Sequence, residues 1–237
     1  MAKESFIQKK QRAARIVGQL KILYPDAHCA LNHDNPFQLL IATILSAQCT
    51  DDRVNRVTPA LFARFPDAPS LAQAEMTDIE NIIRSIGFFR AKAKAIQTTA
   101  RQLTEQYAGE VPQTMNALIQ LRGVGRKTAN VVLGNAFRKN VGVVVDTHVG
   151  RLARRMGLSA HLDPEKVERD MMRLIDQPDW TLLSHLLIFH GRRVCAARKP
   201  NCAGCVFGPA AAAARRLCPQ RGIVIRRQLS KVNVRAR

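Results

Sequence analysis

The chain has 237 residues, of which 46% are hydrophobic, so it can fold around one large core or two smaller ones. Lysine and arginine number 37 against 18 acidic residues, and the net charge of +19 favours a polyanionic partner, nucleic acid or an anionic membrane surface. No apolar run is long enough to span a bilayer and no signal-peptide core opens the chain, so we expect an intracellular protein whose six cysteines are not disulfides.

Apolar residues recur at helical spacing in almost every segment, so the sequence predicts an all-α fold. We expect helices over 6–23, 37–46, 51–65, 78–87 and 90–107 in the N-terminal half. Thr50 or Asp51 could cap the third of these, and Thr77 with Glu80 forms a capping box for the fourth. Residues 47–49 make a short polar break before the third helix.

Two further helices meet at the stretch LRGVGRKTANVV, residues 121–132. Gly123 and Gly125 allow a tight turn between a helix over 114–121 and another over 127–136. The amides of Gly125 and Arg126 then open a helix, where unpaired N–H groups and the positive dipole end attract phosphate. Lys127 lies in the first turn of that helix, and on this motif alone a plain hairpin with a solvated lysine is an equal interpretation.

Residues 141–145 are apolar but too few for a helix, and we interpret them as a buried extended connector to Asp146. Asp146 could cap the helix that follows it. Asp163 should cap a helix that ends at Ile175, and Asp179 a last long helix over 180–190. Residues 215–237 carry eight basic side chains and no acid, which predicts either a tail that contacts nucleic acid or a merely solvated one.

Four cysteines lie close together near the C-terminus: Cys195, Cys202, Cys205 and Cys218. Such spacing is typical of a metal or cluster site, and by itself it leaves zinc and an iron–sulfur cluster equally open. Four other residues are interpreted as ordinary packing residues: Cys29, Cys49, His185 and His190.

Four motifs in order resemble the endonuclease III family of DNA glycosylases, across residues 15–220: SAQCTDDRVN at 46–55, the hairpin, VDTH at 145–148 and CAARKPNCAGC at 195–205. The resemblance implies a two-lobed helix-hairpin-helix glycosylase fold. It assigns 29–140 to a six-helix barrel lobe, 1–28 with 141–220 to a lobe that holds a [4Fe–4S] cluster on the four cysteines, and 221–237 to a basic tail.

The same resemblance implies a base excision repair enzyme with two activities. Lys127 and Asp146 match the catalytic lysine and aspartate, which would remove a damaged base, an oxidised pyrimidine by family, and cleave the abasic site by β-elimination through a Schiff base. The expected partner is double-stranded DNA with damaged bases or abasic sites, bound by a monomer in the bacterial cytoplasm at the nucleoid. Asp146 could instead be only a helix cap.

Further residues are expected to contact DNA, because a stacked base must be swung out before it can react. Gln48 would fill the gap and Phe88 would act as a second wedge, although a capped loop glutamine and a core phenylalanine are the plain alternatives. The remaining candidates are Arg122, Gly123, Gly125, Arg126, His148, Arg198 and Lys199. His148, Arg198 and Lys199 could equally be solvated surface residues.

Three departures from the family pattern stand out. Twelve residues separate the last two cysteines where five are common, at a closure cost of only about 0.8 kcal/mol. Arg122 replaces a proline, and Cys49 stands where a small residue is common. Two alternatives to the bifunctional enzyme stay open: a relative that removes mismatched adenine without lyase activity, and a non-catalytic DNA-binding module.

Overall fold

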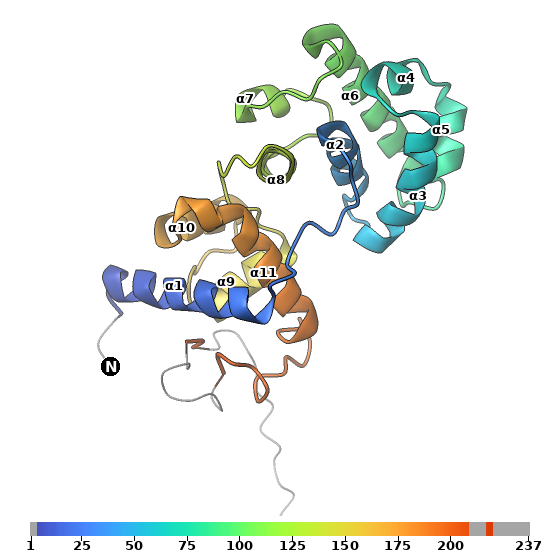
Figure 1. The fold of residues 1–237 in the computed structure, drawn as a ribbon. Helices are drawn as coiled ribbons and strands as arrows, with labels where there is room; N and C mark the ends of the chain where they lie inside the picture. Colours follow the sequence, from blue (N-terminus) through green and yellow to red (C-terminus); the bar gives the residue numbers. More distant parts are fainter. Residues whose placement is uncertain (1–3, 209–216, 220–237) are drawn as a thin grey trace, which may run out of the picture.

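The computed structural model describes residues 4–208 and 217–219, and these residues form helices and no strands, which confirms the all-α prediction (Figure 1). Most of the basic tail over 215–237 lies outside the described residues. The helices are α1 (Phe6–Leu23), α2 (Pro36–Leu45), α3 (Asp51–Arg64), α4 (Ala68–Gln73), α5 (Met76–Ile83), α6 (Phe89–Tyr107), α7 (Met115–Leu118), α8 (Arg126–Ala136), α9 (Thr147–Arg155), α10 (Pro164–Leu174), the 3-10 turn η1 (Gln177–Asp179) and α11 (Trp180–Arg193).

The helices pack around two hydrophobic cores, which define two lobes (Figure 1). The first lobe is built from α2–α8, with the apolar helix α2 at its centre in contact with α3, α6 and α8. The second lobe combines α1 with α9–α11, so the first and the last described helices lie in the same lobe. Helix α8 belongs to the first core but also packs against α11, which places the hairpin at the junction of the lobes.

Helix starts follow capping chemistry in most places. The side chains of Thr50 and Asp163 each accept a hydrogen bond from a first-turn amide, as predicted. The predicted capping box at Thr77 and Glu80 is wrong. Helix α5 begins one residue before Thr77 without any side-chain cap, because Ile79 and Ile83 must face the core and their burial sets its register.

Two other local features differ from the prediction. Helix α4 was not expected, although Asp67 and Ser70 form a capping box at its start. Asp179 stands before α11 but makes no cap hydrogen bond; its carboxylate accepts instead from Lys21 Nζ at 2.7 Å. An aspartate close to a lysine of another helix therefore pairs with it at the expense of its own helix end.

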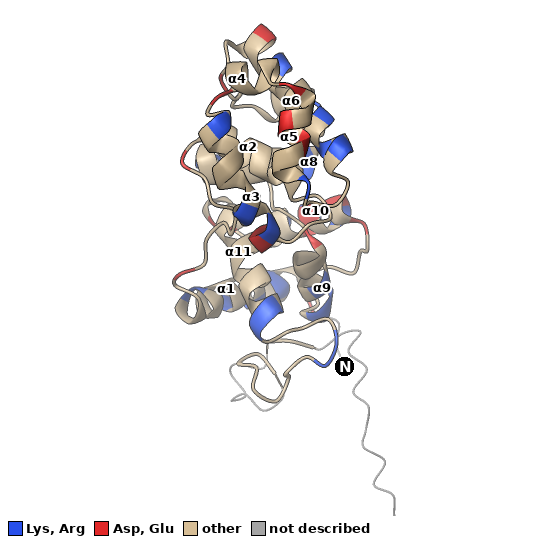
Figure 2. Cartoon of the chain, turned by 90° about the vertical axis from the view of Figure 1, so that its right-hand side faces the viewer, with Lys and Arg blue, Asp and Glu red and all other residues tan. Residues whose placement is uncertain are grey.

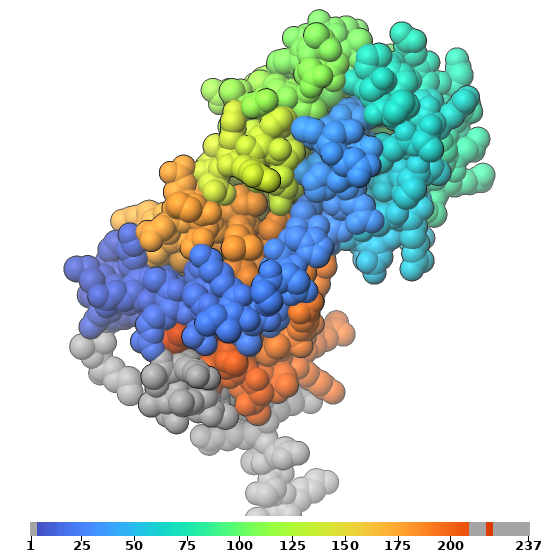
Figure 3. All heavy atoms as spheres, viewed as in Figure 1, coloured from blue at the N-terminus to red at the C-terminus, as the bar shows by residue number. Residues whose placement is uncertain are grey.

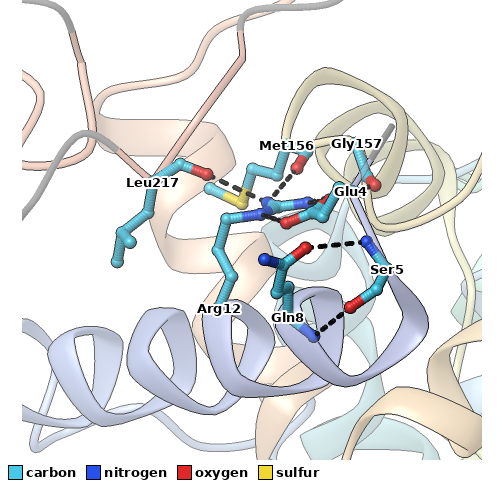
Figure 4. A network of polar contacts seen from close by, with 7 residues as sticks. All are labelled: Glu4, Ser5, Gln8, Arg12, Met156, Gly157 and Leu217. Atoms are coloured by element: carbon cyan, nitrogen blue, oxygen red, sulfur yellow. Dashed lines mark hydrogen bonds and ion pairs between the residues drawn. The ribbon is translucent and has the colours of Figure 1, made fainter. Parts of the chain in front are cut away.

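Arg12 on α1 ties the N-terminal helix to two distant segments (Figure 4). Its Nη1 donates to the carbonyls of Met156 at 2.6 Å and Leu217 at 3.0 Å, while Glu4 accepts from the other side of the guanidinium. This contact holds the residue before Cys218 against the second core, where Leu217 is buried. Within the two described ranges, no helix combines the length and apolar character of a bilayer-crossing segment.

Candidate functional site

A cleft of about 690 Å³ opens between the two lobes. Four of the candidate catalytic and DNA-binding residues line it: Lys127, Asp146, Gln48 and His148. Lys127 comes from the first lobe and Asp146 leads into the second, so both lobes are needed to complete the cleft. Basic residues lie on helices of both lobes (Figure 2), and the net charge of +19 suits a polyanionic partner.

The hairpin supplies Lys127 through a sharp turn after α7. Gly123 has φ +77°, a left-handed value that a side chain would strain, and the amide of Val124 closes the turn on the Leu121 carbonyl at 3.1 Å. Gly125 then stands at the N-cap of α8 with no side chain to bond the first-turn amides. Those amides can therefore receive an anionic ligand beside the exposed Lys127.

Asp146 is fixed by its role as the N-cap of α9. Its Oδ1 accepts a hydrogen bond from the Val149 amide at 2.8 Å, and its carbonyl accepts from Gly150. The connector before it lies outside any helix and is buried from Gly142 to Val145, as expected, although Val141 is exposed; Ser184 Oγ accepts from the Val144 amide at 3.1 Å. Capping and a place in the cleft are therefore compatible: the cap bond uses one carboxylate oxygen and fixes the direction of the group.

His148 follows Asp146 by two residues and is only half-exposed. Burial lowers the pKa of His148, and the nearby Asp146 carboxylate opposes that shift. Its Nδ1 lies 3.1 Å from Nη2 of Arg151, which also donates to the carbonyls of Gly191 and Cys195. Because a cation already donates to Nδ1, the remaining ring nitrogen is the one left to face the cleft.

Gln48 and Phe88 both adopt left-handed backbone conformations, with φ of 52° and 58°. Non-glycine residues rarely do so, and such strain gathers at functional sites. The Phe88 ring is 72% exposed, which excludes the alternative of a core phenylalanine. The loops that carry them are joined, because Arg53 beside the Gln48 loop donates to the Ser85 carbonyl at 3.0 Å. Phe88 does not itself line the cleft.

All four C-terminal cysteines border a second, smaller cavity, which includes Cys218 despite the long segment before it. Arg155 Nη1 lies 3.3 Å from the Cys195 sulfur, and His190 Nε2 lies 3.5 Å from the Cys205 sulfur. In the described part of the chain, no three Cys, His, Asp or Glu side chains converge as one bound ion would require. Arg198 and Lys199 are exposed on the loop between the first two cysteines.

Several residues line the cleft without having been expected there: Arg192 was not a candidate, and His185 and Cys29 were interpreted as ordinary packing residues. Arg192 Nη2 pairs with Asp51 at 2.6 Å and so links α11 to the start of α3 across the cleft. His185 also lines the cleft, where its Nε2 lies 2.7 Å from Asn135 Oδ1. Cys29 is half-buried and lines the cleft as well. No local pattern signals these residues, because each acquires its place only when the lobes pack.

An all-helical, two-lobed fold with a helix-hairpin-helix at the lobe junction defines a class of DNA repair proteins. Residues 41–177 match the HhH-GPD superfamily of base excision DNA repair proteins. The chain is 59% identical to an endonuclease III of Synechocystis, over 83% of this chain and 90% of that protein. It is 44% identical to an endonuclease III of Bacillus subtilis, over 77% and 84%.

A solved structure of a trapped endonuclease III–DNA covalent intermediate matches with a TM-score of 0.81 and 40% identity, covering 89% of this chain and 96% of that one. The chain therefore belongs to the endonuclease III family. It is a base excision repair DNA glycosylase with abasic-site lyase activity, and DNA is its partner. The two alternatives weighed from the sequence, an adenine-mismatch enzyme and a non-catalytic module, are not supported.

Proposed function

We propose that Lys127 and Asp146 carry out base removal and strand cleavage in the cleft between the lobes. The proposal is supported above all by one observation: two residues from different lobes, matched separately to the family's motifs, line the same cleft. The hairpin amides beside Lys127 and the cap bond on Asp146 support it further, since they prepare a phosphate site and a fixed carboxylate.

In this mechanism the bond between C1′ and the base breaks, and positive charge develops on the sugar. The Asp146 carboxylate stabilises that charge. The Lys127 nitrogen attacks C1′ and gives up its two protons, one to the departing base and one to the ring oxygen as the sugar ring opens, so that this nitrogen becomes a Schiff base. Loss of a proton from C2′ then expels the phosphate on C3′, which cuts the strand. We propose oxidised pyrimidines in double-stranded DNA as the substrates, by resemblance to the family.

We further propose that Gln48 fills the space left by the extruded base and that Phe88 wedges into the stack beside it. Their exposure and their strained backbones support this role. The phosphate contacts would come from Arg122, Gly123, Gly125, Arg126, His148, Arg198 and Lys199. The guanidinium of Arg126 is already engaged by Glu168, so its contribution to phosphate binding would be as a nearby charge.

We propose that Cys195, Cys202, Cys205 and Cys218 bind a [4Fe–4S] cluster. The four thiols border one cavity, yet among the described residues they do not converge as a single ion would require, which supports the cluster over zinc. When bound, the cluster would cross-link the segment after α11 and hold the loop of Arg198 and Lys199 in place. The iron and sulfide content of purified protein tests this; a colourless protein with stoichiometric zinc contradicts it.

The proposed organisation assigns 29–140 to the barrel lobe, 1–28 with 141–220 to the cluster lobe and 221–237 to the tail. The two separate hydrophobic cores support this division. We also propose that the protein acts as a monomer on chromosomal DNA in a bacterial cytoplasm, because its relatives are bacterial repair enzymes.

Borohydride trapping tests the role of Lys127 directly, because reduction of a Schiff base leaves a permanent protein–DNA adduct. We expect wild-type protein to be trapped on a duplex with one abasic site and the Lys127→Ala variant not to be trapped. Lys139→Ala is the matched control, since Lys139 is exposed, donates to the Gln113 carbonyl and does not line the cleft. An undiminished adduct with Lys127→Ala would remove Lys127 from the mechanism.

A further inference from the structure

Glu168 on α10 is the one carboxylate that is buried among residues 4–208 and 217–219, with 5% of its surface exposed. A buried carboxylate is costly unless hydrogen bonds and a counter-charge satisfy it. No sequence motif pointed to it, and it lies outside the cleft. Its partners therefore indicate what it does.

Both carboxylate oxygens bind the first turns of α8, the helix of Lys127. Arg126 donates from Nε to Oε2 at 2.8 Å and from Nη2 to Oε1 at 3.1 Å, and Asn130 Nδ2 donates to Oε1 at 2.8 Å. Arg126 immediately precedes Lys127, and Asn130 lies one turn further along the same helix. Because Arg126 pairs in a fork, the carboxylate fixes both the direction and the rotation of the helix start.

The connector that leads to Asp146 passes close to the same carboxylate at Gly142. A Cβ at Gly142 would collide with Glu168 Oε1 and would lie 2.6 Å from Asn130 Nδ2. Gly142 has no left-handed φ, so the reason for glycine there is the close approach of the backbone to this cluster. Figure 3 shows the α8 segment seated between the rest of the first lobe and α10.

We propose that Glu168 is a positioning residue, which keeps Lys127 and Asp146 at the distance that the reaction requires. It does so through its hydrogen bonds to α8 and its close packing against the connector at Gly142. The proposal rests on the catalytic roles assigned above. Glu168 touches neither substrate nor the reacting groups, so its loss should slow the chemical steps while DNA binding is largely kept. A displacement of about 1 Å at a reacting group can cost about 100-fold in rate.

The test compares Glu168→Gln, which keeps the shape and removes the charge, with Glu168→Asp, which keeps the charge and shortens the side chain. Asp170→Asn is the matched control, because it makes the same carboxylate-to-amide change on the same helix. The Asp170 carboxylate accepts a hydrogen bond from Ser159 Oγ at 2.6 Å and does not contact α8. Single-turnover base release, the rate of borohydride trapping, affinity for a duplex with an uncleavable abasic analogue and thermal unfolding are measured for each.

We expect Glu168→Gln to lower both rates by about 10- to 100-fold with less than about a 3-fold change in affinity. Glu168→Asp should recover part of the loss, and Asp170→Asn should match wild type. Wild-type rates in a folded Glu168→Gln variant overturn the proposal, as do equal losses in Asp170→Asn. If Glu168→Gln does not fold, a folded Glu168→Asp decides, and wild-type rates there overturn the proposal.

Failure of the underlying function looks different, because then wild-type protein itself would not be trapped, or the Lys127→Ala variant would still be trapped.

Discussion

Asp146 caps α9, and its proposed catalytic role is a second task that a pair of substitutions can separate from the first. Its Oδ1 accepts the Val149 amide at 2.8 Å, and the rest of the carboxylate faces the cleft. Asparagine is about as good an N-cap as aspartate, whereas alanine at a cap costs about 1 kcal/mol. In a chain of this size that loss lowers Tm by roughly 2–4 °C. Both substitutions remove the charge, and loss of one group that stabilises a transition state typically costs about 10²–10³-fold in rate.

We therefore expect Asp146→Asn and Asp146→Ala to be equally impaired in single-turnover base release, with only the alanine variant less stable. Asp163 is the matched control, because it caps α10 through the Lys166 amide at the same distance of 2.8 Å and lies outside the cleft. Asp163→Ala should lose similar stability and keep full activity. The reasoning would be refuted if Asp146→Asn kept the wild-type rate, or if it lowered Tm as much as Asp146→Ala does.

Four further outcomes are expected. Gly134→Ala should lower the free energy of unfolding by about 1–3 kcal/mol in urea titrations, because the new methyl would overlap Thr181 on α11. Burial lowers the pKa of His185 from 6.5 to about 4. Between pH 6.5 and 4 the unfolded chain therefore binds more protons than the folded one, and the stability of the fold decreases as the pH drops. His185→Gln should reduce the decrease in Tm over this pH range. Phe88→Gly should weaken binding to abasic-site duplexes without lowering Tm, since it removes an exposed side chain from a left-handed position that glycine adopts freely. Gln48→Ala should also weaken binding to these duplexes.

Features encoded within a few residues were predictable from the sequence. The tight turn at Gly123, the cap at Asp163 and the buried connector before Asp146 each follow from local chemistry, and the structure has them. Helix α5 shows the limit, because a good capping pair at Thr77 and Glu80 was overruled by the burial of neighbouring isoleucines. A cap contributes about 1 kcal/mol, while full burial of one isoleucine contributes about 1.5–3 kcal/mol, so packing decides where the two disagree.

Contacts between the lobes were not predictable in the same way. From the sequence, the amide of Arg126 was expected at a phosphate site and Arg126 was a candidate for DNA contact, because it opens a helix next to two glycines. The structure gives that guanidinium a carboxylate partner 42 residues away, at Glu168, and these hydrogen bonds raise the pKa of Arg126. A charged residue beside a motif can thus act indirectly, by fixing the helix that carries Lys127, the proposed reactive amine. Because such a partner lies on another lobe, neither periodicity nor spacing can reveal it, and the separation of Lys127 from Asp146 depends on that long-range contact.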